Sequence, residues 1–183
     1  MVLVSKQLHC LADLLFRAGS GQLPITIPVV VSNHADAANL AKGYGVPFHH
    51  LPVTSGTKAA QEARVMQLVE EFDVDVVVLA RYMQVLSPAL CGQLTAEKGR
   101  GVVNIHHSFL PSFKGAKPYY QAYERGVKLI GATAHFVTEG LDEVSLRLSS
   151  FSASFFLSFF LGSWVARVSL LWSCLGFLAR KRR

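Results

Sequence analysis

Residues 58–79 read KAAQEARVMQLVEEFDVDVVVL, a helical pattern that passes into a β-branched run. Apolar side chains recur at helical spacing between Lys58 and Phe72, at Ala59, Ala63, Met66 and Val69. The segment Val74–Leu79 then carries five apolar residues out of six, which is typical of a strand buried on both faces. A helix followed by such a strand is the repeating unit of a parallel α/β sheet.

The same alternation extends in both directions from this unit. Further strands are predicted at Val2–Val4, Ile25–Val31, Phe48–Leu51, Gly101–Ile105 and Leu129–Val137. Further helices are predicted at Lys6–Arg17, Ala35–Lys42 and Pro118–Arg125. We therefore expect an α/β fold with a doubly wound parallel sheet, in which ligands bind beyond the carboxyl ends of the strands.

Charge and composition divide the 183-residue chain after Glu143. Residues 1–143 contain 12 basic and 12 acidic side chains, whereas residues 144–183 contain six basic and no acidic ones. The second part holds the apolar run Leu148–Ala166 and ends in Arg180-Lys181-Arg182-Arg183. We expect a domain over 1–143 and an apolar Ser/Phe/Leu-rich tail over 144–183, which is either a membrane anchor or translated intron or frame-shifted sequence.

Several classes of partner are disfavoured by the composition. The equal numbers of acidic and basic residues in 1–143 argue against a nucleic-acid partner. Membrane contact is expected only through the apolar, basic-ended tail. The three cysteines lack C-x-x-C spacing, and adjacent histidines on a strand face opposite ways, so we predict no disulfide framework and no metal site. A reduced cytoplasmic compartment is expected, and a homo-oligomer is left open.

Polar residues with the potential for acyl chemistry follow two neighbouring strands. Asn104 and His106 lie two residues apart at the end of one predicted strand, so both side chains should lie on one face. His135 lies on the next strand, and Asp142 lies in the loop that follows. An amide to bind an oxyanion, an imidazole to move a proton and a carboxylate to orient water can together process an acyl group. From spacing alone, hydrogen-bonded or capping residues at strand ends are the favoured interpretation.

The residues from Val2 to Glu143 carry a nearly continuous likeness to a known family. It is carried by residues 103–118, VNIHHSFLPSFKGAKP, and by Ser5-Lys6-Gln7, Ser32-Asn33-His34, residues 48–54 (FHHLPVT) and residues 79–88 (LARYMQVLSP). In these segments the chain resembles the formyltetrahydrofolate deformylases, within the wider formyltransferase family. The resemblance implies the formyltransferase type of α/β sheet and hydrolysis of 10-formyltetrahydrofolate to formate and tetrahydrofolate, with no prosthetic group.

The resemblance also implies roles for individual residues. Asn104 would hold the formyl oxygen, His106 would protonate N10 or polarise the carbonyl, and Asp142 would position and deprotonate water. His135 either supports the site or is only a buried, hydrogen-bonded strand residue. A folate pocket is implied at Met83, Gln84, Val85 and Leu86, and Lys58 would meet the anionic end of the folate. The alternative for the apolar members of that segment is core packing beneath a loop.

Two other functions stay open at this stage: formyl transfer to glycinamide ribonucleotide, and a non-catalytic folate-binding or membrane-tethered pseudoenzyme. The turn Ser5-Lys6-Gln7-Leu8 lacks the glycines with which the transferring relatives cradle a phosphate, which favours water as the acceptor.

The chain also departs from the deformylase pattern. Leu8 replaces a usual glycine, Gly140 replaces a usual acidic residue, and no amino-acid-sensing regulatory domain precedes residue 1. The family continues after Glu143 with Gly-Pro, a further strand and helices, which residues 144–183 do not resemble. We therefore expect a sheet that is incomplete at the C-terminus, through truncation or a shifted frame, and weak or absent turnover.

Overall fold

Six strands form one sheet in the computed structural model, which describes residues 1–96, 101–106, 108, 110, 112–113, 117–128 and 131–137. The strands are β1 (Val2–Val4), β2 (Val30–Ser32), β3 (Phe48–His50), β4 (Val76–Ala80), β5 (Gly101–His106) and β6 (Thr133–Phe136). The helices are α1 (His9–Gly19), the 3-10 helix η1 (Ala35–Ala37), α2 (Ala38–Gly43), α3 (Lys58–Glu71), α4 (Pro88–Ala96) and α5 (Pro118–Glu124).

The strand order is β3-β2-β1-β4-β5-β6. The first five strands of the chain run parallel, with Val2 of β1 paired to Val30 of β2 and to Val78 of β4. The chain thus builds the sheet outward from β1 on one side and from β4 on the other. The point where the order reverses lies between β1 and β4, and in open α/β sheets ligands bind at the carboxyl ends of the strands beside this point.

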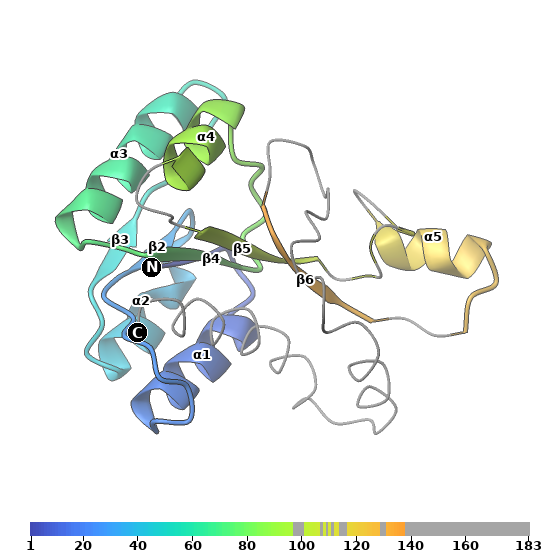
Figure 1. Cartoon of the computed structure of the whole chain (residues 1–183), viewed down its shortest axis with the longest axis horizontal. Helices are drawn as coiled ribbons and strands as arrows, with labels where there is room; N and C mark the ends of the chain where they lie inside the picture. The colour runs from blue at the N-terminus through green and yellow to red at the C-terminus, as the bar shows by residue number, and fades with distance from the viewer. Residues whose placement is uncertain are drawn as a thin grey trace.

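The last strand differs from the parallel arrangement predicted for its neighbours. β6 pairs antiparallel with β5, with Asn104 opposite His135. Figure 1 shows the reason: α5 stands apart from the helices that cover the sheet, so the connection from β5 to β6 does not cross over a face and the chain returns in the opposite direction. The α/β fold class is confirmed, with this one antiparallel edge.

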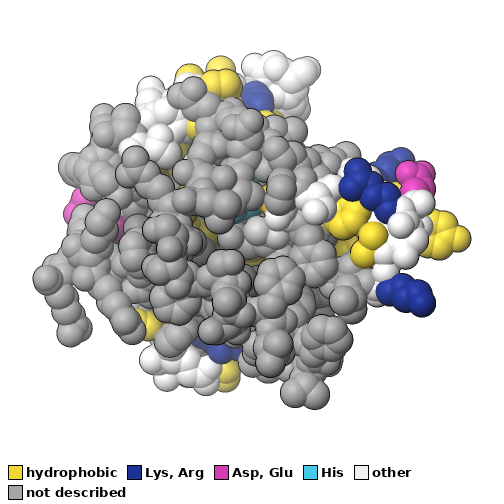
Figure 2. Space-filling model, turned by 45° about the vertical axis from the view of Figure 1, so that its right-hand side comes forward, with side chains coloured by type: hydrophobic (Ala, Val, Ile, Leu, Met, Phe, Trp, Pro, Cys, Tyr) yellow, Lys and Arg dark blue, Asp and Glu magenta, His cyan; other side chains and the backbone are white. Residues whose placement is uncertain are grey.

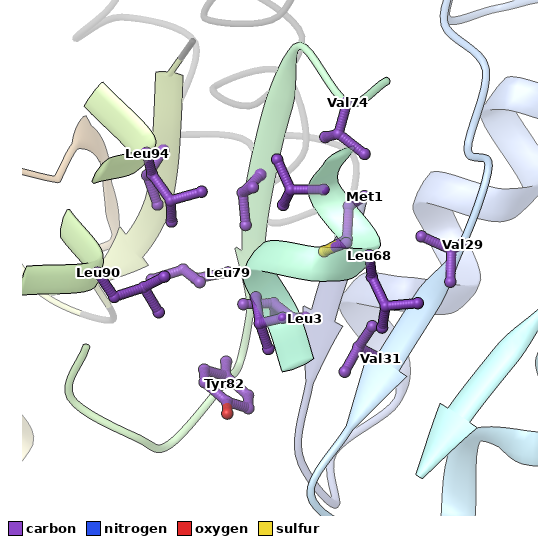
Figure 3. Close-up of a cluster of buried hydrophobic side chains, with 14 residues drawn as sticks. Met1, Leu3, Val29, Val31, Leu68, Val74, Leu79, Tyr82, Leu90 and Leu94 are labelled. Atoms are coloured by element: carbon purple, nitrogen blue, oxygen red, sulfur yellow. The ribbon is translucent and has the colours of Figure 1, made fainter. Parts of the chain in front are cut away.

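Helices cover both faces of the sheet, with α3 and α4 on one side and α1 and α2 on the other (Figure 1). Alternation along β1 sends Val2 and Val4 to the α1 side and Leu3 to the α3 side, where Figure 3 shows Leu3 among side chains from α3, α4 and β2. Because strands at the centre of the sheet are buried on both faces, they read as the continuous apolar runs seen in the sequence.

Three predicted strands start later in the structure than in the sequence pattern, and one of them is Leu129–Val137, which becomes the strand Thr133–Phe136. The run Ile25–Val31 becomes a strand only from Val30, because Pro28 has no N–H to donate to a neighbouring strand. The run Val74–Leu79 becomes the strand Val76–Ala80, after the charged Asp75. These shifts change the bounds of the strands but not their order.

The surface of α5 differs from that of the other helices. It carries three exposed tyrosines, Tyr119, Tyr120 and Tyr123. Figure 2 shows hydrophobic side chains next to Lys and Arg side chains on the part of the molecule that projects to the right. Within the described ranges, no helix has the length and apolar character needed to cross a bilayer. The predicted tail over 144–183 and the predicted domain boundary after Glu143 lie outside the described residues.

Candidate active site

The candidate site lies at the carboxyl ends of β4 and β5, which are parallel neighbours. Residues 81–87 follow β4 and lead into α4, and the loop that includes Ser108 and Phe113 follows β5. Parallel strands end at the same edge of a sheet, so the topology brings the predicted folate segment and the predicted polar residues to one edge. This common edge is the reason to consider them as one site.

The structure places Asn104 and His106 on the same face of β5, as the alternation predicts. Val103 and Ile105 pack in the cluster on the α1 side, whereas Val102 packs in the cluster on the α3 side together with Val137 that follows β6. Asn104 and His106 therefore share the α3 side with His135. Asn104 is half-buried, and His106 and His135 are each only 5% exposed.

His135 orients the carboxamide of Asn104. The Nδ1 of His135 lies 3.1 Å from the carbonyl oxygen of Phe136, and its Nε2 lies 3.4 Å from the Nδ2 of Asn104. Because a carbonyl oxygen only accepts hydrogen bonds, the proton of the neutral ring is on Nδ1. Nε2 then accepts from the Asn104 amide, in a long contact that uses one of its two N–H groups.

His106 holds the loop that follows β5. Its Nε2 lies 2.8 Å from the carbonyl oxygen of Phe113, which also accepts a hydrogen bond of 2.7 Å from the hydroxyl of Ser108. The same reasoning as for His135 puts a proton on Nε2 of His106. The side chain is thus a buried histidine whose Nε2–H is hydrogen-bonded to the loop, and its role in proton transfer stays a prediction. Sequence analysis predicted its face but not this loop contact.

The loop after β5 is also tied to β6 and α5. The Thr133 hydroxyl donates to the carbonyl of Ser108 at 2.8 Å and accepts from the N–H of Leu110 at 3.1 Å. The Arg125 guanidinium donates to the carbonyl of Ser112 at 3.1 Å and lies 5.2 Å from the centre of the Phe113 ring. The Phe113 carbonyl that faces His106 is therefore fixed from two directions.

The predicted folate segment is not buried in the core. Met83 and Val85 are 62% and 61% exposed, so the core-packing alternative is wrong for both. Leu86 does pack against the core on the α3 side, and Gln84 is half-buried. The exposed Met83 and Val85, beside the partly buried Leu86 at a ligand-binding edge of the sheet, are suited to covering an aromatic ligand.

Side chains from other elements fasten both ends of this segment. The Ser5 hydroxyl, beyond β1, accepts a 3.0 Å hydrogen bond from the N–H of Met83 and donates one of 2.7 Å to the side-chain oxygen of Asn33. At the other end the Glu62 carboxylate of α3 accepts from both the N–H and the hydroxyl of Ser87. Ser87 in turn accepts from the N–H of Leu90 and caps α4.

Two predicted site residues have less support from the described contacts. Lys58 is the first residue of α3 and is half-buried, one helical turn before Glu62. This spacing puts Lys58 on the side of α3 that faces the folate segment. Asp142 lies outside the described residues, so its predicted approach to Asn104 and His106 stays a prediction.

Arg81, between β4 and the folate segment, is a residue whose importance sequence analysis missed. Its backbone has φ 59°, and its Nε is buried without a hydrogen-bond partner. Its Nη2 donates to the side-chain oxygen of Gln7 at 3.1 Å. A strained backbone costs about 1–3 kcal/mol, and a buried unpaired donor costs about as much again. The sequence signal that could have identified Arg81 is an arginine directly after the apolar run of a buried strand.

Tyr82, directly before the predicted folate segment, has a shifted pKa. Burial raises the pKa of the Tyr82 phenol above 10.0, opposed by the hydrogen bond from Gln61 and reinforced by nearby Glu62. The neutral phenol accepts from the Gln61 amide at 3.0 Å in the core under Met83. Among the described residues, no cluster of three or more His, Cys, Asp or Glu side chains is arranged to hold a metal ion.

Comparison with known proteins identifies the family of the chain and supports its fold. The family described as formyl transferase matches residues 1–147. The formyltetrahydrofolate deformylase of Corynebacterium sp. (strain P-1) is 55% identical over 143 residues, which cover 78% of this chain and 49% of that protein. The chain spans about half the length of the curated relatives it matches.

Solved structures of two kinds share the fold. The formyltetrahydrofolate deformylase of Burkholderia mallei has a TM-score of 0.69 at 58% identity, covering 78% of this chain and 49% of that one. The phosphoribosylglycinamide formyltransferase of Bacillus halodurans also has a TM-score of 0.69, at 34% identity, covering 78% of this chain and 73% of that one. Similarity in fold is thus equal for the two kinds of protein, and sequence identity is higher for the deformylase.

Proposed function

The chain belongs to the formyl transferase family, and from this membership we propose that it hydrolyses 10-formyltetrahydrofolate to formate and tetrahydrofolate. The higher identity to proteins named formyltetrahydrofolate deformylase than to those named phosphoribosylglycinamide formyltransferase favours water as the acceptor. The substrate and the reaction are proposals for this chain, because it spans about half of those relatives.

One observation supports the proposal more than any other. Asn104 and His106 project from one face of β5, at the sheet edge where the exposed Met83 and Val85 follow β4. A carboxamide donor and an imidazole N–H beside an exposed apolar segment are what a formyl group on an aromatic carrier requires.

In the proposed reaction, water attacks the formyl carbon while the Asp142 carboxylate takes its proton. The formyl oxygen becomes an oxyanion, and Asn104 stabilises it through the N–H that is not directed at His135. The bond from the formyl carbon to N10 then breaks, and N10 takes a proton from the His106 imidazole, whose Nε2–H leaves the Phe113 carbonyl for this step. Asp142 returns a proton to His106, and formic acid leaves and ionises to formate.

Substitution of the two described polar residues tests the proposal in the 183-residue chain. Asn104→Ala should lower kcat for formate release by ~10²–10³-fold, as the loss of one oxyanion donor does. His106→Ala should lower it by ~10²–10⁴-fold, as the loss of a general acid does. Equilibrium binding of 10-formyltetrahydrofolate should change little in either variant, because Met83 and Val85 are retained.

Matched controls are available away from this edge. Asn39 is exposed on α2, and His50 is exposed on β3, which is four strands from β5. Asn39→Ala and His50→Ala should leave formate release unchanged. Turnover in Asn104→Ala and His106→Ala equal to that of the controls would contradict the proposal. Because the 183-residue chain is expected to turn over weakly or not at all, folate binding without formate release contradicts the proposal when it persists in a chimera that carries the C-terminal part of a deformylase relative.

A further inference from the structure

Arg81 combines two unfavourable features in one residue. Its backbone has a positive φ of 59°, a conformation that favours glycine. Its Nε is buried with no hydrogen-bond partner, although buried polar groups are nearly always paired. Unfavourable geometry of this kind persists where the surrounding structure enforces it, and it gathers at sites that bind or exclude ligands.

The position of Arg81 shows what it could affect. It follows the carboxyl end of β4, and its guanidinium reaches the side chain of Gln7 in the turn after β1, with an Nη2 to Oε1 distance of 3.1 Å. β1 and β4 are the two strands between which the strand order reverses. The Arg81–Gln7 hydrogen bond therefore joins the two chain segments that border the ligand-binding point of the sheet.

Charge pairing within the protein does not explain this arrangement. Among the described residues, no carboxylate forms an ion pair with Arg81, and its hydrogen-bond partner Gln7 is neutral. Among the described residues, Arg81 thus combines a backbone in the left-handed region with an unpaired Nε and one side-chain hydrogen bond, to the Gln7 amide. Its effect on the fold is to occupy the space beside the turn Ser5-Lys6-Gln7-Leu8.

We infer that Arg81 is a specificity-determining residue, whose side chain, held by Gln7, keeps a phosphorylated amine from reaching the formyl group. The inference rests on the proposed function, since it states why water is the acceptor. An acceptor amine would attack the formyl carbon, the carbon bond to N10 would break, and a proton from the amine would pass to N10. Hydrolysis needs only a water molecule in place of that amine, and water fits where a ribonucleotide does not.

Binding measurements on variants of the 183-residue chain test the inference without requiring turnover. The probe is glycinamide ribonucleotide, and its Kd is measured by calorimetry. Arg81→Gly removes the side chain at a backbone position that glycine adopts without strain, and it should lower the Kd by about 10-fold or more. Arg81→Met keeps most of the volume without the charge, so its Kd should equal that of the parent chain. Arg17→Ala, which removes a cation at the far end of α1, is the charge control.

Each result supports or overturns the inference. An unchanged Kd in Arg81→Gly overturns it, and so does an equal gain in Arg81→Met, which would show that volume is not what excludes the acceptor. Gln7→Ala leaves Arg81 in place but frees its guanidinium, and it should lower the Kd by about 3-fold. If Arg81→Gly does not fold, an unchanged Kd in Gln7→Ala overturns the inference. Absence of formate release from a chimera that carries the C-terminal part of a deformylase relative would contradict the proposed function alone.

Discussion

Asn104 and His135 face each other across β5 and β6, and their contact decides how the carboxamide is presented. The Phe136 carbonyl fixes the proton of His135 on Nδ1, so that Nε2 accepts from Asn104. A carboxamide without this acceptor can rotate and offer its oxygen, which would repel an oxyanion. His135 is therefore a positioning residue for Asn104 in the proposed reaction.

This pairing predicts the kinetics of His135 variants. His135→Ala should lower kcat for formate release by about 10-fold, because Asn104 loses its orientation but not its donor. His135→Gln keeps an acceptor oxygen and should recover part of the loss. In an Asn104→Ala background, His135→Ala should add nothing, since the residues act as a unit. Additive losses in the double variant would contradict this role and indicate damage to the sheet instead.

The amino group of Met1 gives the stability of the chain a dependence on pH. It is buried and donates to the Val76 carbonyl at 3.0 Å, and this burial lowers its pKa from 8.0 to about 5, against the raising effect of Asp75. Between these values the unfolded chain binds a proton that the folded chain does not. Stability should therefore be full above pH 8 and fall as the pH drops toward 5, by up to about 1.4 kcal/mol per pH unit.

Urea unfolding of the 183-residue chain at several pH values between 5 and 8.5 measures this effect. An Nα-acetylated preparation is the control, because its first nitrogen cannot take up a proton. The difference in slope between the two preparations isolates the amino group from every other titrating residue. Identical slopes would show that the Met1 nitrogen is not buried as the structure has it.

For single residues, the sequence predicts the face of a strand on which a side chain lies better than it predicts which loop atoms the side chain contacts. The period of two along a strand was enough to put Asn104 and His106 on one side of β5. It could not predict that the Phe113 carbonyl meets His106, because that contact depends on the path of a loop. Nor could it predict the positive φ of Arg81, which depends on where β4 ends relative to the turn after β1.

The segment from Met83 to Ser87 behaves as one element held at both ends. Ser5 fastens the N–H of Met83, and Glu62 fastens Ser87 and with it the start of α4. Between these attachments Met83 and Val85 stay exposed in place of collapsing onto the core. The attachments thus fix the backbone of the segment proposed to bind the folate, without touching the reacting groups.

Loss of one attachment should therefore affect binding more than chemistry. Glu62→Gln keeps the shape of the side chain but replaces one acceptor oxygen by a donor, so the bidentate contact with Ser87 is lost. We expect KM for 10-formyltetrahydrofolate to rise about 10-fold while kcat changes less than about 2-fold. Glu71→Gln on the same helix, where the carboxylate is exposed, is the matched control. A fall in kcat at constant KM would contradict this role.

The elements themselves were predicted unevenly, for physical reasons. Strands at the centre of the sheet are buried on both faces and give apolar runs that the sequence shows directly. The direction of β6 was not predictable, because strand periodicity does not encode direction and α5 could have crossed over the sheet. The helix Pro88–Ala96 was missed because it is short and contains Gly92, although Ser87 followed by Pro88 is a helix-start signal.

Over the whole molecule, β6 lies at one edge of the sheet, beside the site. The loop predicted to carry Asp142 follows β6, so any restraint on that carboxylate must come from β6 on one side and from residues after Glu143 on the other. The likeness to the deformylases described from the sequence ends at Glu143, and the match to the family ends at residue 147. A displacement of about 1 Å of a catalytic group can lower a rate by ~10²-fold, so the residues that follow Asp142 should matter to the proposed reaction.

Replacing residues 144–183 by the corresponding part of the Corynebacterium relative should therefore raise formate release. We expect kcat to rise by ~10²-fold while KM changes little, because the chimera keeps residues 1–143 and with them the segment from Met83 to Leu86. The gain should disappear when Asp142→Asn is added to the chimera, which separates restored chemistry from better folding. β6 is an edge strand of the sheet that the described residues form, and covering this edge should also reduce aggregation, with or without the carboxylate. Equal turnover in the chimera and the 183-residue chain would mean that residues 1–143 hold Asp142 in place unaided.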